Sequence, residues 1–373
     1  MTHPRLRILY DHQIFSAQRY GGISRYYFFL LTRLAAGGVA DVSLSLKFSN
    51  NTYLAASDLA KGSFFCGGLQ FRGKGRLMNF LNERYSRARI AAGDYDIFHP
   101  TYFNPYFLDS IGAKPFVLTV YDMIHELFPE NFRSMRGRQL AEWKRTLAAR
   151  AKKIITISET TKNDIVRLYD IDPGRVEPIH LANSLDPAEA RTPENFRLPA
   201  GYLLYVGERS GYKNFRPMAR ALAPLIAKED LRLVCAGGGK FIGTEQAMFA
   251  ELGLKNIVQC PAGDRELAWF YANAAALVVP SLYEGFGIPV LEAFACGCPA
   301  ALAKAGSLPE VGGDAALYFD PADDNSIRET VFRLVTGAML REELKRKGRE
   351  RLKQFSWDLT AEKTFRLYQN LLW

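Results

Sequence analysis

The sequence predicts an α/β protein built from two doubly wound, Rossmann-like domains with parallel sheets. Short apolar segments of strand length alternate with helical patterns along the whole chain, which is typical of β-α-β units. The 373 residues are long for one domain and suit two. A polar stretch over residues 181–200, with three prolines and no apolar period, separates the two series of elements as a linker.

In the first half, the expected strands are short apolar runs and the expected helices show helical patterns. The strands are Leu6–Tyr10, Val42–Leu46, Ile97–His99, Phe116–Val120, Ile154–Ile157 and Val176–His180. The helices are Ile23–Ala36, Gly137–Arg150 and Thr160–Leu168. We therefore expect an N-terminal domain over residues 1–185.

The second half repeats this alternation. Its expected strands are Tyr202–Val206, Leu231–Ala236, Ile257–Cys260, Ala276–Val279 and Ala300–Ala303. Its expected helices are Asn214–Ala227, Thr244–Leu252, Arg265–Asn273 and Pro289–Cys296. We expect a C-terminal domain over residues 186–355, followed by a terminal helix within residues 356–373. Because ligands bind beyond the carboxyl ends of parallel strands, both sheets are expected to line a cleft between the domains.

The positive charge is concentrated in the first half of the chain. Residues 1–185 hold 25 Lys and Arg against 16 Asp and Glu, which accounts for the whole net charge of +9. The basic residues gather at 72–76, 84–89 and 133–153. Three interpretations stay open: a solvated surface, an anionic membrane surface or diphosphate-linked lipid, and nucleic acid.

The sequence predicts a cytoplasmic protein without a membrane span. No apolar run reaches 18 residues, and the first ten residues lead into a strand without a signal-peptide pattern. An odd number of cysteines in a long chain fits reduced core thiols. They are Cys66, Cys235, Cys260, Cys296 and Cys298.

The most informative segment is Pro280–Glu292, with the sequence PSLYEGFGIPVLE between an expected strand and an expected helix. A glycine-rich turn that opens a helix offers unpaired backbone N–H groups and a positive dipole end, and both suit a phosphate. The carboxylates of Glu284 and Glu292 suit hydroxyl groups instead. A ligand that carries both phosphate and many hydroxyls is a nucleotide sugar.

This segment resembles the Glu-x7-Glu signature of the retaining GT4 glycosyltransferases, which have the GT-B fold. Residues 205–214, which end in Lys213-Asn214, and residues 305–314 are similar to flanking segments of that family. Residues 21–25, GGISR, resemble its glycine loop. The resemblance spans most of the chain and is stronger in the second half. It implies that the first domain binds the acceptor, that the second binds the nucleotide sugar, and that the terminal helix crosses back onto the first.

The resemblance also implies roles for individual residues. Lys213, in a loop after a strand, can neutralise a departing diphosphate, and Arg209 is a second candidate cation. Glu292 would accept hydrogen bonds from ribose hydroxyls. Glu284 would contact the donor sugar and stabilise positive charge at its anomeric carbon. The residues expected to bind the donor are Gly21, Gly22, Arg209, Lys213, Gly285, Phe286, Gly287, Ile288, Val290, Leu291 and Glu292.

The first half departs from the family pattern after the strand that ends at Val120. Many relatives carry His-Asp at this point, whereas this chain carries Tyr121-Asp122. His125 can reach the same space if the segment turns helically, so Asp122 and His125 are both candidate catalytic residues. The alternative is a structural role for His125. His99, at the end of another strand, is a further candidate for the acceptor side.

Together these observations predict a retaining glycosyltransferase that moves a hexose from a nucleotide sugar to a saccharide in cell-surface polysaccharide biosynthesis. The expected donor is GDP-mannose, with a UDP-sugar as the alternative. The expected acceptor is lipid-linked and is met at the cytoplasmic face of the inner membrane. No Asp-x-Asp motif follows a strand, so we expect neither a metal nor a cofactor besides the donor. The rival interpretation is a non-catalytic carbohydrate- or nucleic-acid-binding protein. We predict that the protein does not bind nucleic acid, and the oligomeric state stays open.

Overall fold

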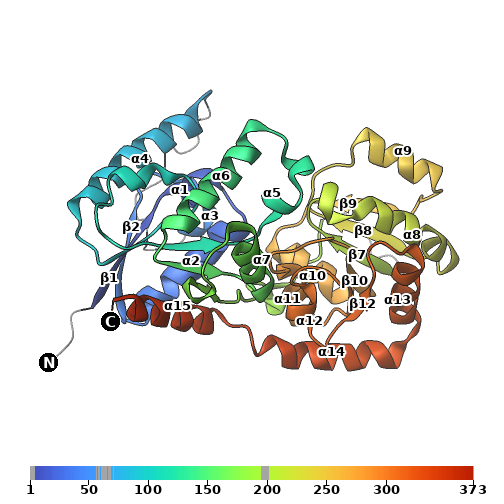
Figure 1. Ribbon diagram of the computed structural model, residues 1–373. Coiled ribbons are helices and arrows are strands. Elements are labelled where there is room, and N and C mark those ends of the chain that lie inside the picture. Colours follow the sequence, from blue (N-terminus) through green and yellow to red (C-terminus); the bar gives the residue numbers. More distant parts are fainter. Residues whose placement is uncertain are drawn as a thin grey trace. The chain divides into compact units, whose positions relative to one another are not determined.

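The computed structural model describes residues 5–55, 57, 59, 65, 69, 71–194 and 201–372 (Figure 1). The chain forms two compact units. Unit 1 comprises Met1–Leu181 and Trp357–Trp373, and unit 2 comprises Ala182–Ser356. The C-terminal segment therefore packs with the first part of the chain, although the whole of unit 2 separates them in sequence.

The centre of unit 1 is a parallel sheet of short, buried strands. It consists of two sets of three strands, with the orders β2-β1-β3 and β4-β5-β6. A parallel bridge between Phe98 and Phe116 joins the two sets. The strands are β1 (Leu6–Asp11), β2 (Ala40–Ser45), β3 (Ile97–His99), β4 (Val117–Val120), β5 (Lys153–Thr156) and β6 (Val176–Pro178). Every residue of β3 and β4 is buried, as is usual where helices cover both faces of a parallel sheet.

The helices of unit 1 are α1 (Gln13–Ala17), α2 (Gly22–Ala36), α3 (Thr52–Ala55), α4 (Lys74–Ala92), α5 (Ile124–Leu127), α6 (Met135–Arg150), α7 (Glu159–Tyr169) and α15 (Trp357–Leu372). Two of them start at serine N-caps. Ser134 Oγ accepts from the N–H of Gly137 at 3.1 Å, and Ser158 Oγ accepts from that of Thr161 at 3.0 Å. Such caps satisfy backbone donors that the first helical turn leaves unpaired.

A buried polar cluster attaches the C-terminal helix α15 to the sheet of unit 1. Tyr368 of α15 shares hydrogen bonds with Tyr10 at 2.6 Å and with His99 Nδ1 at 2.5 Å. The other ring nitrogen of His99 lies 2.9 Å from the hydroxyl of Thr119. Complete burial lowers the pKa of His99 to about 3, so the ring is neutral. His99 is therefore a structural residue of unit 1, and not the acceptor-side residue that its position at a strand end allowed.

Unit 2 is a six-stranded parallel sheet in the order β12-β11-β10-β7-β8-β9. Its strands are β7 (Tyr202–Val206), β8 (Arg232–Ala236), β9 (Ile257–Cys260), β10 (Ala276–Val279), β11 (Ala300–Ala303) and β12 (Leu317–Phe319). The chain builds the sheet outward from β7 in one direction to β9, and then returns to place β10 on the other side of β7. This order is that of doubly wound nucleotide-binding sheets, and its switch point lies between β7 and β10.

The helices of unit 2 are α8 (Phe215–Lys228), α9 (Gly243–Glu251), α10 (Asp264–Asn273), α11 (Ile288–Ala295), α12 (Leu308–Gly312), α13 (Asp324–Thr336) and α14 (Ala338–Leu352). The predicted fold class of two Rossmann-like, parallel α/β domains is confirmed. Among the described residues, no helix has both the length and the apolar composition that crossing a bilayer requires.

Candidate active site

The switch point of unit 2 brings two distant loops together. β7 and β10 pair in parallel, with Leu204 opposite Leu277, so both strands end at the same edge of the sheet. The segment that follows β7 contains the 3-10 turn Gly211–Lys213, and the segment that follows β10 starts at Pro280. A backbone hydrogen bond of 2.8 Å from the N–H of Leu282 to the carbonyl of Tyr212 joins the two segments.

At this edge the structure places Lys213 directly against Glu284. The ammonium group lies 2.8 Å from Oε1 and 3.0 Å from Oε2 of the carboxylate, and Ser281 donates a hydrogen bond to Oε1 at 2.6 Å. The side chains of Lys213 and Glu284 keep 23% and 17% of their surface exposed. Two of the predicted catalytic residues, 71 positions apart, therefore form one charged group that a ligand from solvent can reach.

The backbone conformation after β7 fixes the direction of Lys213. The next residue, Asn214, has φ 55°, a left-handed conformation that asparagine tolerates better than most residues. Its side-chain amide donates to the carbonyl of Pro321 at 2.9 Å. This residue ends the 3-10 turn and starts α8, so the lysine is held at the end of the loop.

The glycine-rich turn before α11 is braced by a second loop. Ser307 donates its hydroxyl to the carbonyls of Glu284 and Phe286, at 2.9 and 2.8 Å. Gly306 has φ 54°, and a Cβ there would lie 2.7 Å from the backbone nitrogen of Glu284, so only glycine fits. Gly287, the N-cap of α11, has φ 99°. The segments around 284–287 and 305–307, which are far apart in the sequence, thus pack against each other.

Within α11, Glu292 is buried and the adjacent apolar residues are part of the core. Oε2 of Glu292 accepts a hydrogen bond of 2.9 Å from the hydroxyl of Tyr271. Burial, and then the charge of Glu292, raise the pKa of Tyr271 well above its ordinary value, so this hydroxyl remains a donor. The side chains of Val290 and Leu291 are completely buried, so only their backbone groups are available to a donor nucleotide.

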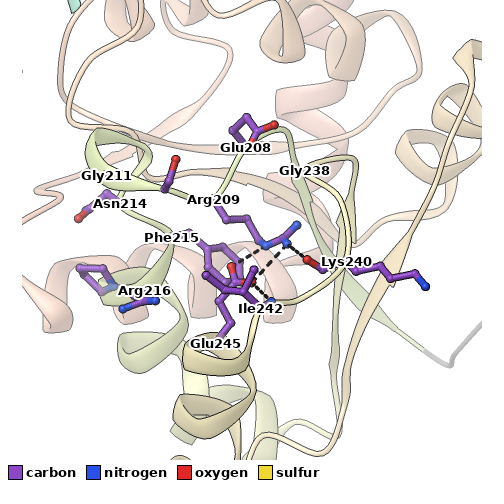
Figure 2. A pocket seen from close by; sticks show the side chains of 12 residues that line it. Glu208, Arg209, Gly211, Asn214, Phe215, Arg216, Gly238, Lys240, Ile242 and Glu245 are labelled. Atoms are coloured by element: carbon purple, nitrogen blue, oxygen red, sulfur yellow. Dashed lines mark hydrogen bonds and ion pairs between the residues drawn. The ribbon is translucent and has the colours of Figure 1, made fainter. Parts of the chain in front are cut away.

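Arg209 lies in the same loop as Lys213 but has a different environment. Its side chain is buried beside Glu245, with Nε 2.8 Å from Oε1 of the carboxylate. Figure 2 shows this side chain extending between Glu245 and the backbone at Lys240, at the wall of a pocket of about 510 Å³. This ion pair could not be predicted from the sequence, because Glu245 lies 36 positions further along the chain.

In unit 1, the predicted donor-binding glycines lie at the start of α2. Gly21 is the N-cap and Gly22 the first residue of this helix. The side-chain carbonyl of Gln18 accepts from the N–H of Ser24 at 3.1 Å, and the hydroxyl of Ser24 donates to the carbonyl of Gly21 at 3.1 Å. A Cβ on Gly21 would lie 2.7 Å from Oε1 of Gln18, so glycine permits this close approach.

Asp122 and His125 lie together after β4. Asp122 Oδ1 accepts from the N–H of Ile124 at 3.2 Å, and His125 is on α5, so the segment turns helically. The His125 ring packs 4.3 Å from that of Phe132, and its Nδ1 is buried without a hydrogen-bond partner among the described residues. Burial, and then the charge of Lys144, lower the pKa of His125. The histidine is therefore neutral near pH 7.

The remaining polar groups around α5 form a buried ion pair. Lys144 lies 2.9 Å from Oε2 of Glu126 and 2.9 Å from the carbonyl of Asp122. Tyr169 donates a hydrogen bond to the other oxygen of Glu126.

Tyr121 takes the position of the family histidine. Its buried hydroxyl donates a hydrogen bond to the carbonyl of Thr101 at 3.3 Å.

The side chains that could bind a metal ion are not clustered in the part of the chain that the structure describes. There, no group of three His, Cys, Asp or Glu side chains is arranged to hold a metal ion. Cys235, Cys260, Cys296 and Cys298 are free thiols, and Cys66 lies outside the described residues.

Comparison with known proteins follows the division into two halves. The family model "Glycosyltransferase Family 4" matches residues 20–186, and "Glycosyl transferases group 1" matches residues 187–351. O-antigen chain mannosyltransferase B of Escherichia coli is 31% identical over 328 residues, which cover 80% of this chain and 84% of that protein.

Solved structures agree on the fold. Sucrose-phosphate synthase from Thermosynechococcus elongatus superimposes with a TM-score of 0.75 at 22% identity and covers 99% of both chains. HepE from Anabaena, in complex with UDP and glucose, gives a TM-score of 0.70 at 17% identity, over 98% of this chain and 100% of that one.

The two Rossmann-like units and their solved structural neighbours identify the fold as GT-B. The chain belongs to glycosyltransferase family 4, as the sequence motifs predicted, and it is a glycosyltransferase.

Proposed function

We propose that this enzyme transfers mannose from GDP-mannose to a saccharide acceptor, with retention, in the assembly of a cell-surface polysaccharide. The name and 31% identity of the E. coli O-antigen mannosyltransferase support the sugar and the pathway class. The observation that carries the proposal is the Lys213–Glu284 pair beside the turn at Gly287. A UDP-sugar is the alternative donor.

In this proposal the charged pair changes partners when the donor binds. The diphosphate attracts the ammonium of Lys213 away from Glu284, and the backbone N–H groups at the start of α11 bind the phosphate oxygens. Negative charge grows on the departing nucleoside diphosphate, and the ammonium stabilises it. The carboxylate of Glu284 then accepts hydrogen bonds from the sugar and stabilises positive charge at the anomeric carbon. Glu292 binds the ribose hydroxyls.

Unit 1 supplies the acceptor side in this proposal. His125 is neutral near pH 7, so its ring can exchange a hydrogen bond with an acceptor hydroxyl. Asp122 lies three residues away, where many relatives carry their aspartate. Gly21 and Gly22, at the start of α2, are proposed to contact the donor through their backbone.

The acceptor is proposed to be lipid-linked, with α4 contacting the cytoplasmic face of the membrane. Arg72, Arg76 and Arg84 are exposed on or beside this helix. Leu77 and Phe80 of the same helix are also exposed, by 45% and 55%. Basic side chains beside exposed apolar ones suit an anionic lipid surface, where each well-placed cation contributes about 1 kcal/mol.

Donor use is tested by incubating the protein with GDP-mannose, UDP-glucose and other nucleotide sugars and measuring the release of free nucleotide. Release of GDP is expected, and the anomeric configuration of the product, measured by NMR, should equal that of the donor. Release from UDP-sugars alone would replace the donor. Nucleotide binding without any release would favour the non-catalytic alternative.

Membrane binding is tested with liposomes of neutral and anionic lipids. Binding to anionic liposomes should fall steeply with salt, because exposed charges are screened within about 8 Å at physiological ionic strength. Reversing the charges of Arg72, Lys74 and Arg76 should weaken it without changing activity on a water-soluble acceptor, whereas reversing the exposed Arg346 and Arg349 of α14 should not. Equal binding to neutral liposomes, or preferential binding to DNA, would contradict the membrane role.

A further inference from the structure

The guanidinium group of Arg209 is surrounded by hydrogen-bond acceptors of the protein itself. Besides Nε on Glu245, its Nη1 donates to the carbonyl of Gly237 at 3.2 Å. Its Nη2 donates to the carbonyls of Gly239 and Lys240, at 3.0 and 3.2 Å, and lies 3.4 Å from the second oxygen of Glu245. The side chain is 4% exposed. All three of its nitrogens therefore donate to acceptors of the protein.

Glu245 connects this arginine to α9. Its Oε2 also accepts from the N–H of Ile242, the N-cap of α9, at 2.8 Å. Burial acts to raise the pKa of this carboxyl, but the hydrogen bonds from Arg209 and from the Ile242 N–H outweigh it and lower the pKa. The carboxylate is thus charged, and it fixes both the guanidinium and the start of the helix.

The carbonyls that Arg209 binds belong to an unusual turn after β8. Gly237, Gly238 and Gly239 have φ values of 80°, 66° and 71°, three left-handed residues in a row. A Cβ on Gly238 would lie 2.5 Å from the carbonyl oxygen of Gly207 and 2.6 Å from Nη1 of Arg209. Glycine loses much conformational freedom on folding, so such a turn needs partners that hold it.

The turn lies beside the candidate active site. β8 pairs with β7, so the glycine turn and the loop that carries Lys213 leave the same edge of the sheet. The pocket of about 510 Å³ is lined by the glycine turn at Gly238, by the β7 loop at Ser210 and by the start of α8 at Phe215. Figure 2 shows Arg209 and Glu245 supporting this wall.

We infer that Arg209 is a positioning residue: with Glu245 it holds the Gly237–Gly239 turn as a rigid wall of the nucleotide site, and it does not bind the diphosphate itself. This inference rests on the proposed function, because it requires a nucleotide in unit 2. It replaces the role that the sequence alone predicted for Arg209 and leaves Lys213 as the cation of that loop for the diphosphate.

Titration calorimetry with GMP and GDP separates the two roles. If Arg209 positions the turn, Arg209→Lys and Glu245→Gln should each weaken GMP and GDP by the same factor, about tenfold for 1.4 kcal/mol. If Arg209 binds the diphosphate, Arg209→Lys should weaken GDP far more than GMP. Glu245→Gln, which removes the competing carboxylate, should then leave GDP affinity unchanged or raise it. That second pattern would overturn the inference.

Two further variants keep the test decisive if a single charge deletion fails to fold. Gly238→Ala disturbs the turn while both charges remain, and Arg209→Met with Glu245→Met removes both charges together. Each should raise the donor KM about tenfold and leave kcat within about twofold. Normal KM in Gly238→Ala would count against the inference. The control removes the exposed Arg265–Glu189 pair of unit 2, 3.1 Å apart, and should change neither constant.

The wild-type titration distinguishes this inference from the proposed function. If the protein binds UDP in place of GDP, the same comparison is made with UMP and UDP, and only the donor assignment changes. If the wild-type protein binds none of these nucleotides, the proposed function fails and this inference fails with it.

Discussion

Replacing Lys213 with alanine removes the ammonium group that lies 2.8 Å from Glu284. The effect on folding should be small. Both side chains are partly exposed, and ion pairs of this kind contribute about 0–1 kcal/mol, so Tm should fall by no more than roughly 2–4 °C for a unit of this size. The carboxylate also keeps its hydrogen bond from Ser281.

The effect on catalysis should be much larger. Loss of one electrostatic contact that stabilises transition-state charge typically lowers kcat by about 10²–10³. GDP affinity should also fall, because the unpaired carboxylate of Glu284 would face the diphosphate. Adding Glu284→Gln to Lys213→Ala should therefore restore part of the affinity while kcat remains low.

The assay measures GDP release from GDP-mannose, GDP affinity by calorimetry and Tm for each variant. Lys228→Ala, which removes an exposed lysine from α8, is the control and should behave as wild type. A Lys213→Ala rate within a few-fold of wild type would remove Lys213 from the mechanism. A loss of Tm above about 10 °C would show a structural role instead.

Glu292→Gln should weaken GDP binding about tenfold or more, because a hydrogen bond to a charged acceptor contributes about 1.5–3 kcal/mol. Glu284→Gln should instead mainly lower kcat. Unchanged GDP affinity in Glu292→Gln would refute the assignment of this residue to the ribose. Transfer should continue in EDTA, since a lysine and helix N–H groups can balance the diphosphate; loss that Mg²⁺ or Mn²⁺ restores would reveal a metal site. Stability should fall as pH drops from 6.5 towards 3, because His99 is protonated only in the unfolded state within that window. The slope due to this residue, about 1.4 kcal/mol per pH unit in denaturant titrations, should disappear in His99→Phe.

Most of the fold was predictable from sequence because its strands are buried on both faces. A strand such as Ala276–Val279 is then a continuous apolar run, and all four of its residues are buried. β12 (Leu317–Phe319) escaped prediction although β3, which has the same length, was predicted, because only one of the three residues of β12 is buried. The apolar signal therefore identifies strands that are buried along their whole length, and it misses a short strand that is only partly buried.

Helix α4 was missed for a different reason. Its buried stripe consists of Met78, Asn82, Ser86 and Ile90, and two of these four residues are polar. Asn82 caps the backbone N–H groups of Lys47 and Phe48, and Ser86 lies 2.6 Å from the hydroxyl of Ser45. Because these polar residues are satisfied by partners far away in the chain, the sequence shows a basic segment without an apolar period.

In the candidate site, too, side-chain partners that are distant in the chain could not be predicted from the sequence. The sequence placed Lys213 and Glu284 at strand ends, and parallel topology then made them neighbours. It could not show that Ser281 and Ser307 hold the carboxylate and the turn, or that Arg209 is paired with Glu245, because these contacts depend on side-chain directions. Spacing predicts which loops meet, and only the structure shows which side chains of those loops face a ligand.

Both sheets have a point at which the strand order reverses, but the polar residues at these two points differ in their exposure. This contrast supports the assignment of the donor to unit 2. In unit 1 the strand order reverses between β1 and β3, and the carboxylate of Asp11 is buried at the strand ends there. Asp11 accepts hydrogen bonds from the N–H and hydroxyl of Thr101, at 2.8 and 2.7 Å, and from the hydroxyl of Tyr106 at 3.1 Å. Its charge is therefore satisfied within the protein. At the switch point of unit 2, Lys213 and Glu284 remain partly exposed, so their charges can exchange partners with a nucleotide diphosphate and a sugar.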